Sequence, residues 1–398
     1  MPGHILVLTI PAQGHMRPAL AVTGELVRRG HRVSFLTADG FEPAVRATGA
    51  TAFRYDSLLG EALGPGRYTS LTPDMLAWSA VLFLRESTRL VTLARRLFAD
   101  DVPDLVLYDM IVAPAGRALE RLWDRPAVQS TPSLASNDHY AQVRAVQERS
   151  GVTDDHPAVT ELLSQAATFA ADLGITAAPE YLVDWRADRS LVYVPREFQP
   201  FGETFGTETT FAGPCLSPEY TRQTWRAPRT GPPLVVISMG TLYNHQPDFF
   251  ARCVRAFDGQ PWRTVITLGN GSDPKQLGPL PSNIEVHPWI PQLAALRQAD
   301  VFVTGVGLGS LMESLYAGTP PVLIPQVPET RVLSHRAAEL GLGTILDPGE
   351  VTEETLLTAV NRTATDKALR ERVRRMPEVM ERAGGIRHAA EALEAHLP

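Results

Sequence analysis

The sequence predicts an α/β protein made of two doubly wound domains, each with a parallel sheet covered by helices on both faces. Three observations indicate this class: short apolar strands alternate with helical stretches, the pattern starts twice, and a segment rich in proline and glycine separates the two runs. Such alternation is typical of parallel sheets, because each crossover helix returns the chain to the same end of the sheet. Ligands of these sheets bind at the carboxyl ends of the strands, so we expect a site in a cleft between the domains.

The first run begins close to the N-terminus. It comprises strands over 4–10, 31–37, 103–109 and 126–130, with helices from the Gly14 turn to Arg29 and over 112–123. Gly30 stands just past the first helix, where glycine commonly ends one. Residues 60–100 and 133–185 are predicted to be helical or irregular insertions that are rich in aromatic side chains.

The second run restarts at residue 234. It comprises strands over 234–238, 262–268, 284–287, 300–304 and 320–326, helices over 246–258 and 311–318, and amphipathic helices over about 365–378 and 385–396. Proline and glycine cluster between the runs, which favours a linker there. We therefore predict an N-terminal domain at 1–212, a linker at 213–232, a C-terminal domain at 233–380 and a last helix within 381–398.

The composition is that of a globular enzyme. With 398 residues, 44% hydrophobic and 20% charged, the chain can bury two cores. Its formal net charge of −7 gives no basic footprint, so nucleic-acid binding is not expected. No apolar run reaches the length of a membrane span, and the N-terminus has no leader-like segment. The two cysteines, Cys215 and Cys253, fit a reducing compartment, so we expect a cytoplasmic protein without membrane contact.

A glycine-rich turn between a predicted strand and a predicted helix is the most informative motif. It reads Gly-Val-Gly-Leu-Gly-Ser over 305–310. The first amide groups of a helix lack intrahelical partners and carry partial positive charge, so such a terminus binds phosphate. The turn therefore indicates a phosphorylated ligand, in particular a nucleotide. It also matches a dinucleotide fingerprint loosely, with Glu329 about where a ribose-binding acid would stand, so a nicotinamide enzyme is an alternative.

Two residues at the ends of predicted strands could carry acid–base chemistry. His15 lies in the first βα turn, where an imidazole can act as a general base near neutral pH. Asp109 ends the strand 103–109, whose carboxyl end should lie beside that turn, and it could hold His15 in one tautomer. The plain alternatives are a helix-terminal histidine without a catalytic role and an aspartate that only caps the helix before Val112.

Two further residues could bind a nucleoside. Trp289, which is followed by Pro291 and Gln292, could stack a base against its indole face, and the plain alternative is a core tryptophan. Glu313 could accept hydrogen bonds from a ribose, and the plain alternative is a solvated helix face. The sequence has no Asp-x-Asp pair, so no metal site is predicted.

In this order the motifs resemble those of the family 1 glycosyltransferases of the GT-B fold, over essentially the whole chain. The segments that carry the resemblance are Ala-Gln-Gly-His at 12–15, the strand ending at 109, Ser-Met-Gly-Thr at 238–241, Trp-Ile-Pro-Gln at 289–292 and the block 304–330. The nearest likeness is to bacterial enzymes that transfer deoxysugars from TDP donors to macrolides and enediynes. The resemblance implies two Rossmann-like domains facing across a cleft, an acceptor domain and then a nucleotide-sugar domain, with the last helix crossing back to the first.

The resemblance also implies roles for single residues. The family's histidine base and its supporting aspartate fall on His15 and Asp109, and the reaction inverts the anomeric centre. Its base-stacking tryptophan and ribose-binding glutamate fall on Trp289 and Glu313. The donor site is thus predicted at Gly240, Thr241, Trp289, Gln292, Gly305, Gly307, Gly309, Ser310, Glu313, Glu329 and Thr330.

Two positions depart from the family pattern. The family normally has Thr-His-x-Gly where this chain has Gly305, and that histidine donates to the pyrophosphate of the donor. Loss of one charge-assisted hydrogen bond costs about 1.5–3 kcal/mol, so we expect weakened or re-routed donor binding, with Arg331 or His335 as the replacement. The Asp-Gln pair that grips hexose hydroxyls in many relatives reads Glu329-Thr330 here. A shortened contact set suits a deoxysugar, which favours a TDP-deoxysugar over UDP-glucose.

The acceptor pocket is predicted in the aromatic insertions of the first domain, and an apolar polyketide-like aglycone is expected there. Its candidate residues are Tyr68, Trp78, Phe83, His139 and Tyr140. For Trp78 and Phe83, which stand at helical spacing, an ordinary core role is an equal alternative.

The predicted reaction is a single displacement between a nucleotide-sugar donor and a small-molecule aglycone, without metal or other cofactor. Three other functions stay open: a homologue disabled at Gly305 that keeps a binding or auxiliary role, an NAD-dependent enzyme, and a sugar-nucleotide epimerase. The oligomeric state is open as well, a homodimer being one form.

Overall fold

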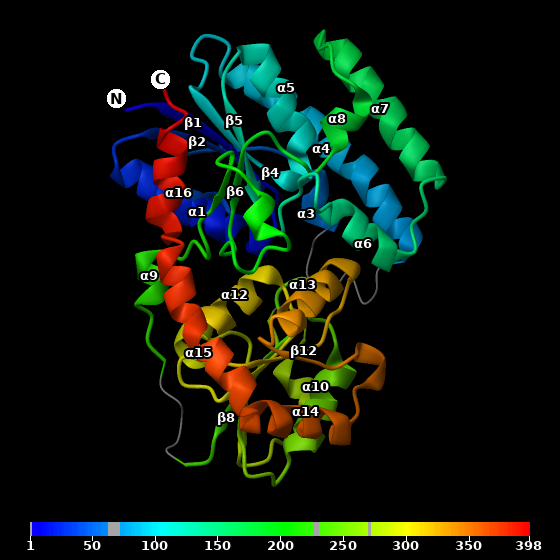
Figure 1. Cartoon of the computed structure of the whole chain (residues 1–398), viewed down its shortest axis with the longest axis vertical. Helices are drawn as coiled ribbons and strands as arrows, with labels where there is room; N and C mark the ends of the chain where they lie inside the picture. Colours follow the sequence, from blue (N-terminus) through cyan, green and yellow to red (C-terminus); the bar gives the residue numbers. More distant parts are fainter. Residues whose placement is uncertain (1, 63–71, 226–230, 270–271) are drawn as a thin grey trace. The chain divides into compact units, whose positions relative to one another are not determined.

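The computed structural model describes residues 2–62, 72–225, 231–269 and 272–398, which form two compact units (Figure 1). The first unit contains the described part of Met1–Leu63 together with Thr72–Ser217 and Ala383–Pro398. The second contains the described part of Pro218–Arg382. The chain passes from one unit to the other inside the segment rich in proline and glycine.

Within the described residues, the first unit has a seven-stranded sheet in the order β3-β2-β1-β4-β5-β6-β7, parallel throughout. Its strands are β1 (His4–Leu8), β2 (Arg32–Thr37), β3 (Thr51–Arg54), β4 (Leu105–Asp109), β5 (Ala127–Thr131), β6 (Ser190–Val192) and β7 (Thr209–Phe211). β1 and β4 are central neighbours and pair Leu8 with Tyr108. Because parallel strands end at the same side of a sheet, the residues that follow β1 and β4 lie next to each other.

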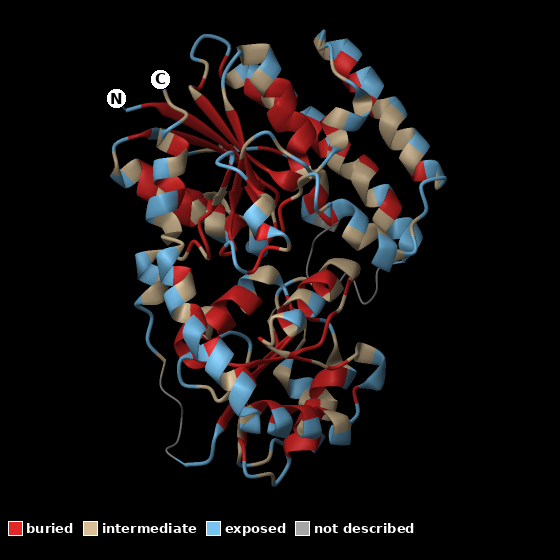
Figure 2. Ribbon diagram, viewed as in Figure 1, coloured by how far each residue is buried: buried red, intermediate tan, exposed pale blue. Residues whose placement is uncertain are grey.

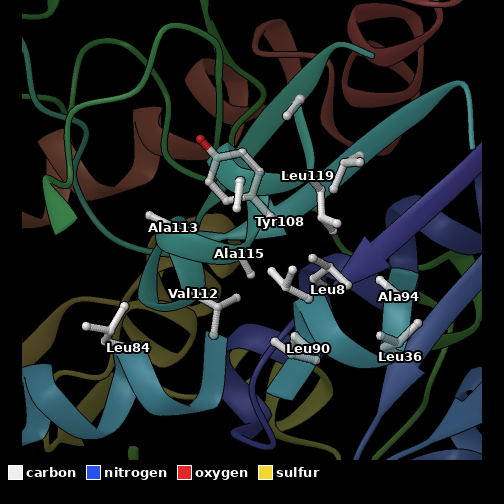
Figure 3. Packing of buried hydrophobic residues seen from close by; sticks show 14 of the residues in the cluster. Leu8, Leu36, Leu84, Leu90, Ala94, Tyr108, Val112, Ala113, Ala115 and Leu119 are labelled. Carbon is white, nitrogen blue, oxygen red and sulfur yellow. The ribbon is translucent and has the colours of Figure 1, made fainter. Parts of the chain in front are cut away.

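Helices cover both faces of this sheet. They are α1 (Gln13–Arg28), α2 (Glu42–Ala47), α3 (Leu58–Ala62), α4 (Pro73–Leu97), α5 (Ala113–Trp123), α6 (Gln142–Ser150), α7 (Pro157–Leu173), α8 (Pro179–Val183) and α16 (Gly385–Glu394), with 3₁₀ turns η1 (Met110–Val112) and η2 (Gly202–Thr204). Successive side chains of β1 enter two different cores, because strand side chains alternate between faces. Ile5 and Val7 pack with α1 and α16, whereas Leu6 and Leu8 pack with α4 and α5. Figure 3 shows the second core, with Leu8, Leu90, Tyr108 and Leu119 gathered in it.

The second unit repeats this plan. Within the described residues it has a six-stranded parallel sheet in the order β10-β9-β8-β11-β12-β13. Its strands are β8 (Leu234–Ser238), β9 (Arg263–Thr267), β10 (Ile284–His287), β11 (Val301–Thr304), β12 (Pro321–Leu323) and β13 (Thr344–Ile345). Its helices are α9 (Pro218–Thr221), α10 (Pro247–Phe257), α11 (Gln292–Leu296), α12 (Leu308–Ala317), α13 (Pro328–Glu339), α14 (Glu353–Thr365) and α15 (Lys367–Arg382), with 3₁₀ turns η3 (Pro274–Leu277) and η4 (Pro348–Glu350). In both units the central strands are buried (Figure 2), whereas the edge strands β3 and β10 are partly exposed.

The last helix of the chain belongs to the first unit, where α16 lies alongside α1 (Figure 1). The N–H of Gly385 donates to the carbonyl of Ala212 at 2.8 Å. Arg29, just past α1, pairs with Glu394 at 2.7 Å. The apolar side chains of α16 complete the core under α1, which explains why an amphipathic helix at the end of the chain is attached here.

The predicted fold class, two doubly wound α/β domains, is confirmed, and the differences concern where elements begin and end. The helix predicted at 311 begins at Leu308, because the glycine turn itself supplies the first helical residues. The strand predicted over 320–326 covers only Pro321–Leu323, since its neighbour β13 is two residues long and offers few partners. Among the described residues, none of the helices combines the length and the apolar character needed to cross a bilayer.

Candidate active site

In the first unit, His15 and Asp109 form a hydrogen-bonded pair. His15 lies in the first turn of α1, and Asp109 is the last residue of β4. Because β1 and β4 are adjacent, the two side chains meet after the strands end, and Nδ1 of His15 lies 2.8 Å from Oδ2 of Asp109. The carboxylate is fully buried, whereas the imidazole keeps 22% of its surface exposed. One member is therefore fixed by the protein and the other is accessible.

The carboxylate of Asp109 is held from three sides. Oδ1 accepts the N–H of Ile111 at 2.9 Å, as a cap of η1, and Oδ2 also lies 3.4 Å from the hydroxyl of Thr9. The capping role and the pairing with His15 thus occur together, one on each oxygen. A carboxylate can only accept, so the bond to His15 requires a proton on Nδ1 and makes Nε2 the basic nitrogen.

The candidate acceptor residues occupy two separate segments of the first unit. Trp78 on α4 is 41% exposed, so a buried core role is wrong for it, whereas Phe83 on the same helix packs against the core. His139 and Tyr140 lie in the loop between β5 and α6, where His139 is exposed and the Tyr140 hydroxyl donates to Gln142 at 2.5 Å. Tyr68 lies outside the described residues. Their contact with an acceptor stays a prediction.

In the second unit, Trp289, Gln292 and Glu313 stand at the carboxyl side of the sheet. Trp289 follows β10 and is 58% exposed, so the alternative of a core tryptophan is wrong. Glu313 on α12 is buried, so the alternative of a solvated face is also wrong. The amide of Gln292 donates to Oε2 of Glu313 at 2.7 Å and to the hydroxyl of Ser310 at 3.2 Å. Gln292 thus ties α11 to the first turns of α12.

The glycine turn after β11 leads directly into α12, with Gly307 as its N-cap. Gly307 and Gly309 are exposed, so the backbone at this helix start is accessible. Val306 between the strand and the helix is fully buried with a φ of 66°. A β-branched residue rarely adopts this left-handed conformation, which costs about 1–3 kcal/mol and persists only where the surroundings enforce it.

Gly305 packs against the turn that follows β8. β8 pairs with β11 at Ser238 and Thr304, and the N–H of Gly305 donates to the carbonyl of Ser238 at 3.2 Å. A Cβ on Gly305 would come within 2.9 Å of the carbonyl oxygen of Met239. The backbone of one turn therefore occupies the space that a side chain at 305 would need, and a histidine there requires the two turns to move apart.

Four residues of α13 have predicted roles, and for two of them, Thr330 and Arg331, the structure gives partners. The hydroxyl of Thr330 is buried and caps the helix, accepting the N–H of Val327 at 3.0 Å, which does not fit the expectation that it grips the sugar. Arg331 pairs with Asp347 at 3.1 Å and stays partly exposed, so its expected role as the replacement phosphate donor stays a prediction. His335 is exposed and Glu329 is half-buried, so these two stay predictions.

The sequence analysis did not predict a role for three amide side chains that follow β8 and β12. Asn244 donates to the carbonyl of Gly240 at 3.1 Å, and Gln246 donates to Gln326 at 2.7 Å. The signal was present in the sequence, since all three amides follow the carboxyl ends of strands.

Comparison with known proteins identifies the family. Residues 255–386 match the family model of the erythromycin biosynthesis protein CIII-like C-terminal domain. The chain is 36% identical to demethyllactenocin mycarosyltransferase of Streptomyces fradiae, over 99% of this chain and 86% of that protein. It is 33% identical to the NDP-glycosyltransferase YjiC of Bacillus licheniformis, over 99% of this chain and 98% of that protein. The chain belongs to the family 1 glycosyltransferases of the GT-B fold.

A solved structure gives the same assignment for this glycosyltransferase. The present chain superposes on the crystal structure of CalG4, the calicheamicin glycosyltransferase, with a TM-score of 0.87 and 34% identity. The match covers the whole of this chain and 98% of CalG4. The two units are therefore the two Rossmann-like domains of a GT-B fold, and the chain is a glycosyltransferase. Membership in this family disfavours the dehydrogenase and epimerase alternatives.

Proposed function

We propose that this glycosyltransferase moves a sugar, in particular a deoxysugar, from a TDP-sugar to a hydroxyl of an apolar natural-product aglycone, with inversion at the anomeric carbon. The observation that carries the proposal is the hydrogen bond of 2.8 Å between the partly exposed His15 and the buried Asp109. It supports an imidazole with a fixed tautomer, in which Nε2 is the basic nitrogen.

In the proposed reaction, Nε2 of His15 takes the proton of the acceptor hydroxyl while its oxygen bonds to the anomeric carbon. The bond from that carbon to the diphosphate oxygen breaks on the opposite side, and TDP leaves with the electron pair. The imidazolium then releases its proton to water. Asp109 stabilises the imidazolium as it forms, because its carboxylate is buried against Nδ1.

The donor is proposed to bind to the second unit. The exposed indole of Trp289 is suited to stacking on thymine, and the Gln292–Glu313 pair is suited to the ribose hydroxyls. The exposed backbone at Gly307 and Gly309 is suited to the diphosphate. Negative charge grows on the leaving diphosphate, and fixed amide dipoles stabilise it without reorganising, so we propose that no metal is required.

The identity of sugar and aglycone rests on more indirect support. Two relatives, each 36% identical to this chain, are named a demethyllactenocin mycarosyltransferase and an oleandomycin glycosyltransferase, the latter over the whole of this chain. Of the pair at 329–330, Thr330 is turned into a helix cap, which leaves fewer groups for sugar hydroxyls and favours a deoxysugar. We propose the cytoplasm as the compartment, since Cys215 and Cys253 are both free and buried.

A thermal-shift titration with TDP, UDP and NAD tests the donor. A ligand at a hundred times its Kd stabilises the folded state by about 2.7 kcal/mol, which gives a measurable rise in Tm. Selective stabilisation by TDP is expected, together with release of TDP when a TDP-deoxysugar and an acceptor are supplied. No rise in Tm with either TDP or UDP would contradict the proposal and favour a homologue disabled at Gly305.

A further inference from the structure

Asn244 stands behind the turn that follows β8, in a loop that runs from Met239 to Gln246 before α10 begins. Its side chain is 1% exposed, and its amide nitrogen donates to the carbonyl of Gly240 at 3.1 Å. Gly240 has a φ of 82°, and Thr241 after it is exposed. The hydrogen bond from Asn244 therefore fixes a left-handed backbone position at the surface where the donor turn begins.

The other polar atom of this side chain, Oδ1, has no partner in the described part of the chain. Among the described residues, nothing forms a hydrogen bond with Oδ1 of Asn244, although the atom is buried. A buried polar atom without a partner costs about 1–3 kcal/mol, and buried side-chain polar atoms are usually paired. An apolar side chain at this position would avoid the cost of the unpaired oxygen. We therefore infer that the hydrogen bond from the Asn244 amide to the Gly240 carbonyl outweighs that cost.

The neighbouring loop is shaped around Asn244. Gly269 follows β9 with a φ of 62°, and a Cβ there would come within 2.2 Å of the amide nitrogen of Asn244. A second amide bridge continues across the same side of the sheet, where Gln246 donates to Gln326 after β12. The loops after three strands are thus arranged so that the amide of Asn244 reaches Gly240.

The turn that Asn244 holds, at Met239 and Gly240, packs against the glycine turn at 305–310. Gly240 and Met239 follow β8, and Gly305 lies against the Met239 carbonyl. A displacement of Gly240 would therefore change the spacing of both turns, whereas Trp289 after β10 would be unaffected.

We propose that Asn244 is a positioning residue for the donor diphosphate, acting through the backbone of the Gly240–Thr241 turn. This inference rests on the proposed nucleotide site of the second unit. The chain lacks the family histidine at position 305, so the geometry of its backbone amides decides how tightly the diphosphate is held. Asn244 sets that geometry for one of the two turns.

The substitution Asn244→Asp tests this inference. Aspartate has the same shape but presents a carboxylate to the Gly240 carbonyl, so the turn is repelled rather than held. We expect the Kd for TDP to rise about tenfold, and the KM for the nucleotide sugar to rise more than kcat falls. Binding of thymidine, which has the base and sugar but no phosphate, should stay within about twofold of wild type by calorimetry.

Asn283→Asp is the matched control. Asn283 also donates from its amide to backbone carbonyls, those of Phe257 and Trp262 at 2.7 and 3.1 Å, but it precedes β10 at the opposite side of the sheet. This variant should lower Tm without changing the ratio of TDP to thymidine affinity. If Asn244→Asp does not fold, Asn244→Ala removes the same hydrogen bond without adding charge and is expected to give the same selective loss.

The outcomes separate this inference from the function on which it rests. Wild type that binds neither TDP nor UDP overturns both. Wild type that binds TDP, with Asn244 variants that bind it equally well, overturns the positioning role alone. Equal losses for TDP and thymidine also overturn it, because they would show general damage to the second unit.

Discussion

The two sheets of this glycosyltransferase share one strand order over six strands, to which the first sheet adds β7. In each sheet, candidate groups follow the ends of the same two central strands. In the first unit these are the ends of β1 and β4, and in the second the ends of β8 and β11. The first pair presents two ionisable side chains, His15 and Asp109. The second presents glycine turns, with backbone groups exposed at Gly307 and Gly309.

The difference suits the chemistry that we propose for each site. Proton transfer needs a group that titrates near neutral pH and is held at one point, which only a side chain supplies. A diphosphate spreads its charge over many oxygens and is matched by several amides at a helix start. In the proposed function, the same fold position serves catalysis in one unit and anion binding in the other. Three predictions test this contrast, and a fourth tests how α16 supports the first unit.

The largest effect is expected for His15→Ala. Turnover should fall by about 10²–10⁴ because the acceptor hydroxyl loses its base, while the Kd for TDP stays unchanged in the other unit. Steady-state kinetics and calorimetry measure the two quantities. His287→Ala is the control, since His287 is also near a carboxylate, Glu285 at 3.4 Å, but lies on β10. Full turnover in the His15→Ala enzyme would contradict the role of His15 as the general base.

A somewhat smaller loss, about 10²-fold in turnover, is expected for Asp109→Asn. The new amide would donate to Nδ1 of His15, so the proton would move to Nε2 and the base would be lost. The cap on Ile111 can survive on Oδ1. Asp104→Asn is the control, because Asp104 accepts the N–H of His4 near the opposite end of β4. Equal losses in both variants would mean that Asp109 acts through stability only.

Substitutions at Gly305 sharpen the other half of the contrast. Both Gly305→Ala and Gly305→His should weaken TDP binding about tenfold, because a Cβ would meet the Met239 carbonyl at 2.9 Å. Gly24→Ala on α1, where a Cβ makes only ordinary contact with Thr48, is the control. Tighter TDP binding by Gly305→His would show that the backbone site is incomplete and that this chain has lost a needed side chain.

The smallest effect concerns the support of the first unit by α16. A hydrogen bond from Arg28, and a further one from Arg29, lower the pKa of Glu25 to about 2 despite partial burial. Folding keeps this carboxylate ionised where the unfolded chain would protonate, so its contribution is full above about pH 4.5 and is lost as the pH falls towards 2. The effect is small because Arg28 is largely exposed, and water weakens the pair.

Glu25→Gln should therefore flatten the acid side of the stability profile, measured as urea midpoints at about pH 6 and about pH 3.5. Glu381→Gln is the control, since the side chain of Glu381 near the end of α15 is exposed and forms no hydrogen bond or ion pair within the described part of the chain. An unchanged slope in Glu25→Gln would show that the contacts of α16 do not depend on this network.

The sequence by itself determined the fold class, the order of the elements and the motifs at the strand ends. Apolar strands and glycine-terminated helices are local patterns, so β1, α1 and the turn at 305–310 could be read directly. The pairing of His15 with Asp109 could also be anticipated, because adjacent parallel strands bring their ends together whatever the side chains are.

Only the tertiary structure decided which polar groups were already engaged. The sequence indicated Thr330 as a sugar-binding residue, but its hydroxyl caps α13. The ion pair of Arg331 with Asp347 has no signal in the sequence either. Glu313 is buried although its plain alternative was a solvated helix face, and Trp289 is exposed although its plain alternative was the core. Burial depends on residues far away in the chain, so the sequence could not decide it. The close approach of Gly305 to Met239 and the bond from Asn244 to Gly240 arise where separate loops meet, and no local pattern encodes such contacts.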